Sequence, residues 1–183
     1  TPKFYYGLNI NATYKGFDMS MFFNFMYDFD VLNANKIMLT TWADNKENNF
    51  LMDIASDKRW RNFDDMGNEI RYSPEVLAEF NKNATMWNPT SIGRPICMSY
   101  AVEDGSFLRL STLTVGYTFP QRWLSRLGVK SLRLYFSGSN LFTLTGYSGY
   151  DPEVNIQKGL TPGIDNNVTP RSRVYTLGMN LNF

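Results

Sequence analysis

The chain has 183 residues, a formal net charge of +1 and no His. This balance argues against a nucleic-acid partner, which would need a strongly basic surface, and the absence of His removes the commonest general base and metal ligand. Cys97 is the single cysteine, so a disulfide framework and a paired-cysteine redox or zinc motif are excluded.

The sequence contains no run of about 18 apolar residues, which excludes a membrane-spanning helix. The strands of a transmembrane barrel need only about 9 to 11 residues, half of them polar. The mean hydropathy of −0.33 therefore leaves a membrane barrel open.

The first segments of the chain alternate apolar and polar residues with a period of two, which predicts β-strands. The expected strands span about 4–14 and 17–28, and Lys15-Gly16 forms the hairpin turn between them. The apolar positions are Phe4, Tyr6, Leu8, Ile10, Ala12 and Tyr14 in the first strand and Phe17, Met19, Met21, Phe23, Phe25 and Tyr27 in the second.

Alternation stops at about 31–103, where Asn, Asp, Pro and isolated Trp dominate. Within this stretch Ser73, Pro74 and Glu75 form a helix start signal, so a short helix is expected there. Ordinary connections have about 4 to 6 residues. A connection this long indicates an elaborate loop.

Alternation returns at about 106–119, 131–143 and 172–183, which predicts three more strands. A short connection that begins at Pro120 and contains a brief helical turn joins the first two of them. A second irregular segment at about 145–170, rich in Gly, Pro and Asn, precedes the last strand.

The four connections therefore alternate between short and long. Transmembrane barrels have this asymmetry, with short periplasmic turns and long extracellular loops. Aromatic residues also gather at both ends of the first two strands, where their rings suit the headgroup layers. The pattern predicts an all-β fold of antiparallel transmembrane barrel strands with long extracellular loops. The alternative is a soluble β-sandwich that binds carbohydrate through its loop tryptophans.

Five strands cannot close a barrel, and an open edge in lipid leaves unpaired backbone groups that cost several kcal/mol each. The chain also begins TPKFYY, with no initiator Met and no signal peptide. We therefore expect it to be a piece of a longer protein whose other strands lie outside this sequence.

Two stretches resemble the C-terminal end of SusC/RagA-type TonB-dependent outer-membrane transporters. They cover 103–154 and 172–183, and their most specific part is SGSNLFTLTGYSGYDPEV. The resemblance implies a barrel of about 22 strands, of which this chain supplies the last five, while the plug domain and the earlier strands are absent.

The same resemblance implies a bacterial outer-membrane importer of oligosaccharides or peptides. Its implied partners are the remainder of the transporter, a SusD-like surface lipoprotein over the mouth, and TonB acting through the missing N-terminal part. Lipid or lipopolysaccharide would surround the barrel.

No catalytic residue, cofactor or metal site is expected. The sequence offers no nucleophile–His pair and no phosphate-binding loop, and carboxylate pairs such as Asp64-Asp65 are common in solvated loops. An enzymatic or adhesin barrel would need a catalytic constellation or more regular strands. Substrate or lid contact is instead expected from four aromatic residues of the long loop, with packing of the loop on itself as the alternative. These residues are Trp42, Trp60, Tyr72 and Trp87.

The final strand ends on an aromatic residue, which is unusual for a terminus in water. Its alternating positions are Tyr175, Leu177, Met179, Leu181 and Phe183. We expect these side chains to face lipid. Resemblance to outer-membrane proteins implies that the terminal Phe also marks the chain for the barrel-assembly machinery.

Overall fold

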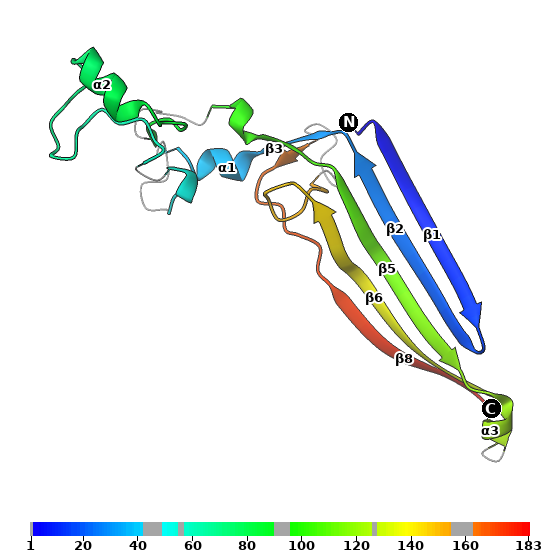
Figure 1. Ribbon diagram of the computed structural model, residues 1–183. Helices are drawn as coiled ribbons and strands as arrows, with labels where there is room; N and C mark the ends of the chain where they lie inside the picture. The colour runs from blue at the N-terminus through cyan, green and yellow to red at the C-terminus, as the bar shows by residue number, and fades with distance from the viewer. Residues whose placement is uncertain (1, 42–48, 55–56, 90–95, 126–127, 155–162) are drawn as a thin grey trace. The chain divides into compact units, whose positions relative to one another are not determined.

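The computed structural model describes residues 2–41, 49–54, 57–89, 96–125, 128–154 and 163–183 (Figure 1). The chain divides into two compact units. The first contains residues 1–31 and 103–183, and the second contains residues 32–102.

The first unit is built on a five-stranded antiparallel sheet in which neighbouring strands follow the order of the chain. This confirms the predicted fold class. The strands are β1 (Phe4–Tyr14), β2 (Phe17–Tyr27), β5 (Phe107–Thr118), β6 (Ser131–Thr145) and β8 (Val174–Asn182). β1 and β8 form the two edges of the sheet (Figure 1).

Short connections lie at one end of this sheet, which we call the turn end. β1 and β2 are joined by Lys15 and Gly16, both with positive φ (45° and 90°), as a two-residue hairpin turn requires. β5 and β6 are joined at the same end through α3 (Gln121–Leu124), beside the C-terminus (Figure 1). Long segments leave the opposite end.

Two irregularities interrupt the strand alternation in the middle of the sheet. Phe22 and Phe23 of β2 pair with Thr112 and Leu110, so Ser111 is an extra residue on β5. On β6, Asn140 and Leu141 lie between the residues that pair with Thr112 and Leu110, and Asn140 has a φ of 53°. A bulge exchanges the two faces of a strand. The one in β5 therefore places Arg109 on the face opposite Leu113 and Val115.

Three short strands form a second sheet in the order β4-β3-β7. They are β3 (Asp30–Asn33), β4 (Val102–Asp104) and β7 (Ile164–Asp165). Strands of two to four residues are too short to show alternation, so the sequence did not reveal them. Nearby, Val31 and Phe107 are buried and form part of the core of the first unit.

The second unit contains short helices held by side-chain hydrogen bonds. They are α1 (Ala34–Met38), η1 (Met52–Ile54), α2 (Pro74–Asn81) and η3 (Ser99–Ala101). α2 begins at Pro74, as the start signal predicted, although the Ser73 side chain makes no capping hydrogen bond. Asn81, at the end of α2, accepts from the Arg61 amide at 2.7 Å and donates to the Arg61 carbonyl at 2.9 Å. Among the described residues, no helix is long and apolar enough to cross a membrane.

Candidate functional site

One face of the five-stranded sheet is apolar on every strand, and we call it the apolar face. Most of its side chains are exposed, and Leu177 is 85% exposed. An apolar surface that extends over five strands is far larger than water-soluble monomers usually expose. The register places on this face Phe4, Tyr6, Leu8, Ile10, Ala12 and Tyr14 of β1; Phe17, Met19, Met21, Phe23, Phe25 and Tyr27 of β2; Leu108, Leu110, Leu113, Val115 and Tyr117 of β5; Leu132, Leu134, Phe136, Phe142 and Leu144 of β6; and Tyr175, Leu177, Met179 and Leu181 of β8.

Aromatic rings gather at both ends of the apolar face. At the turn end the rings of Phe17 and Tyr117 lie 4.5 Å apart, and Phe119 lies 5.0 Å from Tyr117. At the opposite end the rings of Phe25 and Tyr27 stack at 6.0 Å. This distribution matches the two interfacial belts of a membrane-spanning sheet.

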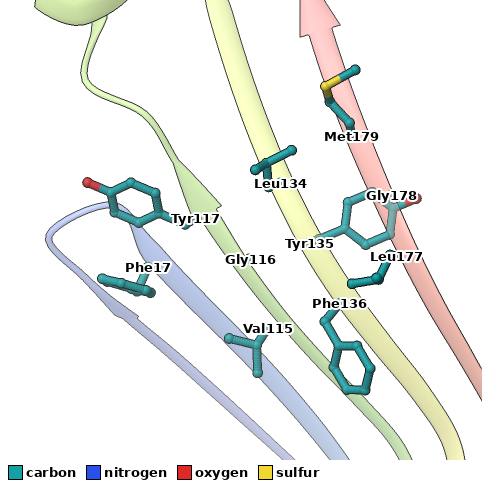
Figure 2. Close-up of a pocket in the computed structure, with 10 residues that line it drawn as sticks. All are labelled: Phe17, Val115, Gly116, Tyr117, Leu134, Tyr135, Phe136, Leu177, Gly178 and Met179. Carbon is teal, nitrogen blue, oxygen red and sulfur yellow. The ribbon is translucent and has the colours of Figure 1, made fainter.

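A shallow groove of about 550 Å³ crosses the apolar face near the turn end (Figure 2). Val115 lies within it as a small side chain, with the rings of Phe17 and Phe136 on either side. The groove is lined by Phe17, Val115, Gly116, Tyr117, Leu134, Tyr135, Phe136, Leu177, Gly178 and Met179.

The opposite face, which we call the polar face, carries mainly Asn, Thr, Ser and Gly. Arg133 of β6 lies across Gly116 and donates through Nε to Asp18 Oδ1 of β2 at 2.9 Å. A Cβ at Gly116 would meet the guanidinium group, so glycine makes room for the ion pair. A Cβ at Gly178 would likewise meet the ring of Tyr135.

A buried charge cluster lies on the polar face, away from the turn end. Arg109 of β5 is 2% exposed. Its Nη2 donates to Asp151 Oδ1 at 2.5 Å, its Nε donates to Thr143 Oγ1 at 3.1 Å, and its Nη1 lies 3.1 Å from Glu153 Oε2. The Arg109 guanidinium therefore fixes the segment that follows β6 to β5, the middle strand of the sheet.

Arg171 completes this charge cluster from the segment that precedes β8. Its Nη2 donates to Glu153 Oε1 at 2.9 Å, and its backbone N–H donates to Asp151 Oδ2 at 3.4 Å. Two cations thus face two carboxylates in this cluster, and removing one of the buried partners would leave uncompensated charge. The cluster joins three segments that are distant in the sequence.

Tyr147 and Ser148, which precede Asp151 in the chain, are also held by hydrogen bonds. The Tyr147 hydroxyl donates to Asp165 Oδ2 at 2.7 Å, and burial, helped by this hydrogen bond, raises the pKa of the Tyr147 phenol. Ser148 donates from its backbone N–H and its Oγ to the Glu103 carboxylate at 2.9 and 2.8 Å. Tyr150, between these anchors and Asp151, is 86% exposed.

An exposed aromatic side chain on a rigid segment loses little conformational freedom when it contacts a ligand. Sequence reasoning missed Tyr150 because Gly149 and Pro152 beside it already explained the motif as a turn. The signal that could have found it is an aromatic residue inside a turn that also carries two carboxylates.

The structure describes three of the four aromatic residues predicted to contact substrate or lid. Trp42 lies outside the described residues. Trp60 and Tyr72 are 41% and 79% exposed. Trp87 is half-buried, donates from Nε1 to the Thr40 carbonyl at 3.1 Å, and lies edge-on to Tyr100 at 5.2 Å. Within the described part of the chain, no ring contact joins Trp60, Tyr72 and Trp87 to one another.

Asp64, in the same unit, organises its own loop. Its side chain accepts hydrogen bonds from the backbone N–H groups of Met66 and Asn68 at 2.9 and 2.8 Å, and from Asn68 Nδ2 at 3.0 Å. The Asn68 side chain, with these N–H groups, lowers the pKa of the carboxyl. No group of acidic, His or Cys side chains in the described residues could hold a metal ion.

The five residues proposed as an assembly signal lie at the C-terminal edge. Tyr175, Leu177, Met179 and Leu181 share the apolar face of β8. All four are exposed, and so is Phe183, which follows the strand.

Comparison with known proteins defines the class. No family model matches the sequence. TonB-dependent receptor P3 of Formosa agariphila is 33% identical over 189 residues, which cover the whole chain and 16% of that receptor. TonB-dependent receptor SusC of Bacteroides thetaiotaomicron is 37% identical over 86 residues, which cover 46% of this chain and 8% of SusC.

The solved structure of the RagAB peptide importer in its closed-closed state matches the whole chain with a TM-score of 0.73. The identity is 21%, and the match covers 17% of that importer chain, so it supports the fold alone. The sheet is thus part of a large outer-membrane barrel. More particularly, the chain belongs to the SusC/RagA-type TonB-dependent receptors. It spans about a sixth of the length of the two relatives whose matches cover the whole of this chain, and both are named as TonB-dependent receptors.

Proposed function

We propose that the chain forms five wall strands and two external loops of a bacterial outer-membrane importer, and that the barrel is energised through TonB. The observation that carries this proposal is the sheet itself, whose five meandering strands have an apolar face on one side and a mainly polar face on the other. In a barrel wall the apolar face contacts lipid and the polar face lines the lumen.

The edges of the sheet support this arrangement. β1 and β8 each pair on one side only within the described residues. A strand edge cannot stay unpaired in a bilayer core, because its backbone groups find no water there. Other strands of the same transporter would therefore pair with β1 and β8, and the chain would be the C-terminal part of that barrel.

The lengths of the connections indicate how the sheet is oriented across the membrane. The turn end would face the periplasm, and the long segments at the opposite end would face the outside of the cell. Trp60 and Tyr72 would then lie in an external loop, where exposed rings can contact a ligand or a SusD-like lipoprotein that closes over the mouth.

The charge cluster supports a role in substrate contact. It holds the segment 146–154 against the polar face and so narrows the lumen near its outer end. Tyr150, exposed on this fixed segment, would contact passing oligosaccharide or peptide. A rigid aromatic side chain loses little conformational freedom when it binds.

The test is uptake by the full-length protein. A strain lacking its gene and a complemented strain are supplied with labelled neutral oligosaccharides and labelled peptides, each with and without an uncoupler of the inner-membrane potential. We expect gene-dependent, uncoupler-sensitive uptake of one of the two substrate classes. Equal uptake of both classes in the two strains would contradict the proposal.

The soluble sandwich alternative receives no support from the geometry. A sandwich requires a second sheet packed on the apolar face. The second sheet in the described residues is formed by β3, β4 and β7, which together have far too few residues to cover five strands.

A further inference from the structure

We propose that the groove at the turn end of the apolar face is a binding site for one glycerophospholipid, with an acyl chain in the groove and the phosphate beside Arg122. This inference rests on the proposed function, because it requires the turn end to lie in the periplasmic leaflet of the outer membrane. It assigns a specific lipid to a surface that otherwise contacts the bilayer in general.

The groove is formed by two adjacent rows of side chains that run across the strands. Phe17, Tyr117, Leu134 and Met179 are register partners in the row nearer the turn end, and Val115, Phe136 and Leu177 continue the next row. Val115 is the small member, so the surface is hollow between the larger side chains (Figure 2). The groove has a volume of about 550 Å³ and is open along the apolar face, so an acyl chain could lie in it while the rest of the lipid stays in the leaflet.

A continuous series of ring contacts leads from the groove to a cation. Phe17 and Tyr117 lie 4.5 Å apart, Tyr117 and Phe119 5.0 Å, and Phe119 and Trp123 6.3 Å. The Arg122 guanidinium carbon lies 5.8 Å from the centroid of the Trp123 ring. Trp123 is 55% exposed, as a ring in the headgroup layer would be.

The charges of the turn end complement a phosphate group. The described residues of the two short connections include Lys15, Arg122 and Lys130, and the sequence of these connections contains no Asp or Glu. The nearest acid on the strands, Asp18, is already paired with Arg133 on the polar face. An Arg guanidinium matches a phosphate with two parallel hydrogen bonds. Arg122 lies beside the Trp123 ring at the end of the series of ring contacts, so we assign the phosphate to it.

Apolar contact alone would not select this lipid. In a bilayer the surrounding acyl chains are as apolar as the groove, so no hydrophobic gain follows from exchanging one for another. Selection therefore comes from close packing around Val115 and from the ionic contact at Arg122. A lipid that satisfies both stays bound when the bulk bilayer is removed.

The position of the groove favours phospholipid over the other possible occupants. Lipopolysaccharide would have to lie in the outer leaflet, at the opposite end of the strands. A second copy of the transporter would need an interface that extends well beyond a groove of this size.

The test is native mass spectrometry of the full-length transporter, extracted in mild detergent and incubated with vesicles of phosphatidylethanolamine and phosphatidylglycerol. Val115→Trp fills the groove, and Arg122→Gln removes the cation. Leu8→Trp adds the same ring to the apolar face of β1, outside the groove, and serves as the matched control.

We expect one retained phospholipid per wild-type transporter, about a tenfold lower occupancy in Val115→Trp, and a several-fold loss in Arg122→Gln that is greatest at low ionic strength. Leu8→Trp should bind like the wild type. Equal occupancy in all four proteins, retention of lipopolysaccharide in place of phospholipid, or a change in the oligomeric state of Val115→Trp without lipid loss would each overturn the lipid site. Uptake is measured in the same strains. If the lipid site is overturned while uptake stays normal, the transport proposal still stands.

Discussion

Arg109 and Asp151 form a buried ion pair with 2.5 Å between Nη2 and Oδ1, although 42 residues separate them in the chain. Arg109 lies on the polar face because the extra residue Ser111 shifts the alternation of β5. Without that bulge, the guanidinium would face lipid, where an unpaired charge is costly. The bulge and the ion pair are therefore parts of one arrangement.

We predict that Arg109→Ala destabilises the barrel strongly. The change leaves the Asp151 and Glu153 carboxylates buried without their main cation, and breaking a buried pair from one side costs about 3–5 kcal/mol. The full-length protein should lose its folded gel mobility at a clearly lower temperature than the wild type. Lys82→Ala, which breaks the pair between two exposed side chains, Lys82 and Glu79, is the control and should leave that temperature unchanged. Equal behaviour of the two variants would contradict the role of the cluster.

Tyr147 should stay protonated at a pH where exposed tyrosines ionise. Burial and the hydrogen bond to Asp165 raise its pKa, so its contribution to stability is complete below the pKa of an unfolded tyrosine and is lost only as the pH rises towards the folded value. Tyrosinate absorbance is titrated in the folded wild type and in Tyr147→Phe, and the two curves should coincide up to about pH 11. A missing ionisation near pH 10 in the variant would show that Tyr147 titrates normally.

Tyr150 should matter for ligand rather than for folding. Removing an aromatic contact typically costs about 0.5–1.5 kcal/mol, so Tyr150→Ala should weaken uptake of the transported substrate by about twofold to tenfold. Tyr150→Phe keeps the ring and should retain most of the uptake. Surface abundance is measured alongside and should be equal in all three proteins. If both substitutions leave uptake intact, the exposed ring has no part in transport.

Deletion of Phe183 should lower the amount of full-length protein in the outer membrane. The residue ends the exposed apolar row of β8, which we propose the assembly machinery recognises. Quantitative immunoblotting of outer-membrane fractions measures the effect, and Phe183→Tyr, which keeps an aromatic terminus, provides the control. Unchanged abundance of the deletion variant would refute the assembly role.

The long strands could be predicted because β1 and β2 alternate without interruption, and lipid on one side with a polar lumen on the other enforces that period. The bulges at Ser111 and Asn140 could not be predicted, because they depend on how neighbouring strands pair. The short strands β3, β4 and β7 gain their order from one another and leave no local pattern.

The charge cluster was also beyond sequence reasoning, because Arg109 and Asp151 meet only through the register of β5 and β6. Trp87 was predicted to contact substrate or lid because it lies in the long loop, and that prediction stays untested. Its hydrogen bond to the Thr40 carbonyl and its packing on Tyr100 could not be read from the sequence, because they join residues that are distant in the chain.

The most direct test of the membrane-wall account is epitope accessibility on intact cells. One tag is inserted between Met66 and Gly67 in the long loop, and another after Gly128 in the turn-end connection, where the surroundings are open. The account predicts that antibody labels the first tag on intact cells and the second only after the outer membrane is permeabilised. Labelling of the Gly128 tag on intact cells, or failure to label the Met66 tag, would contradict it.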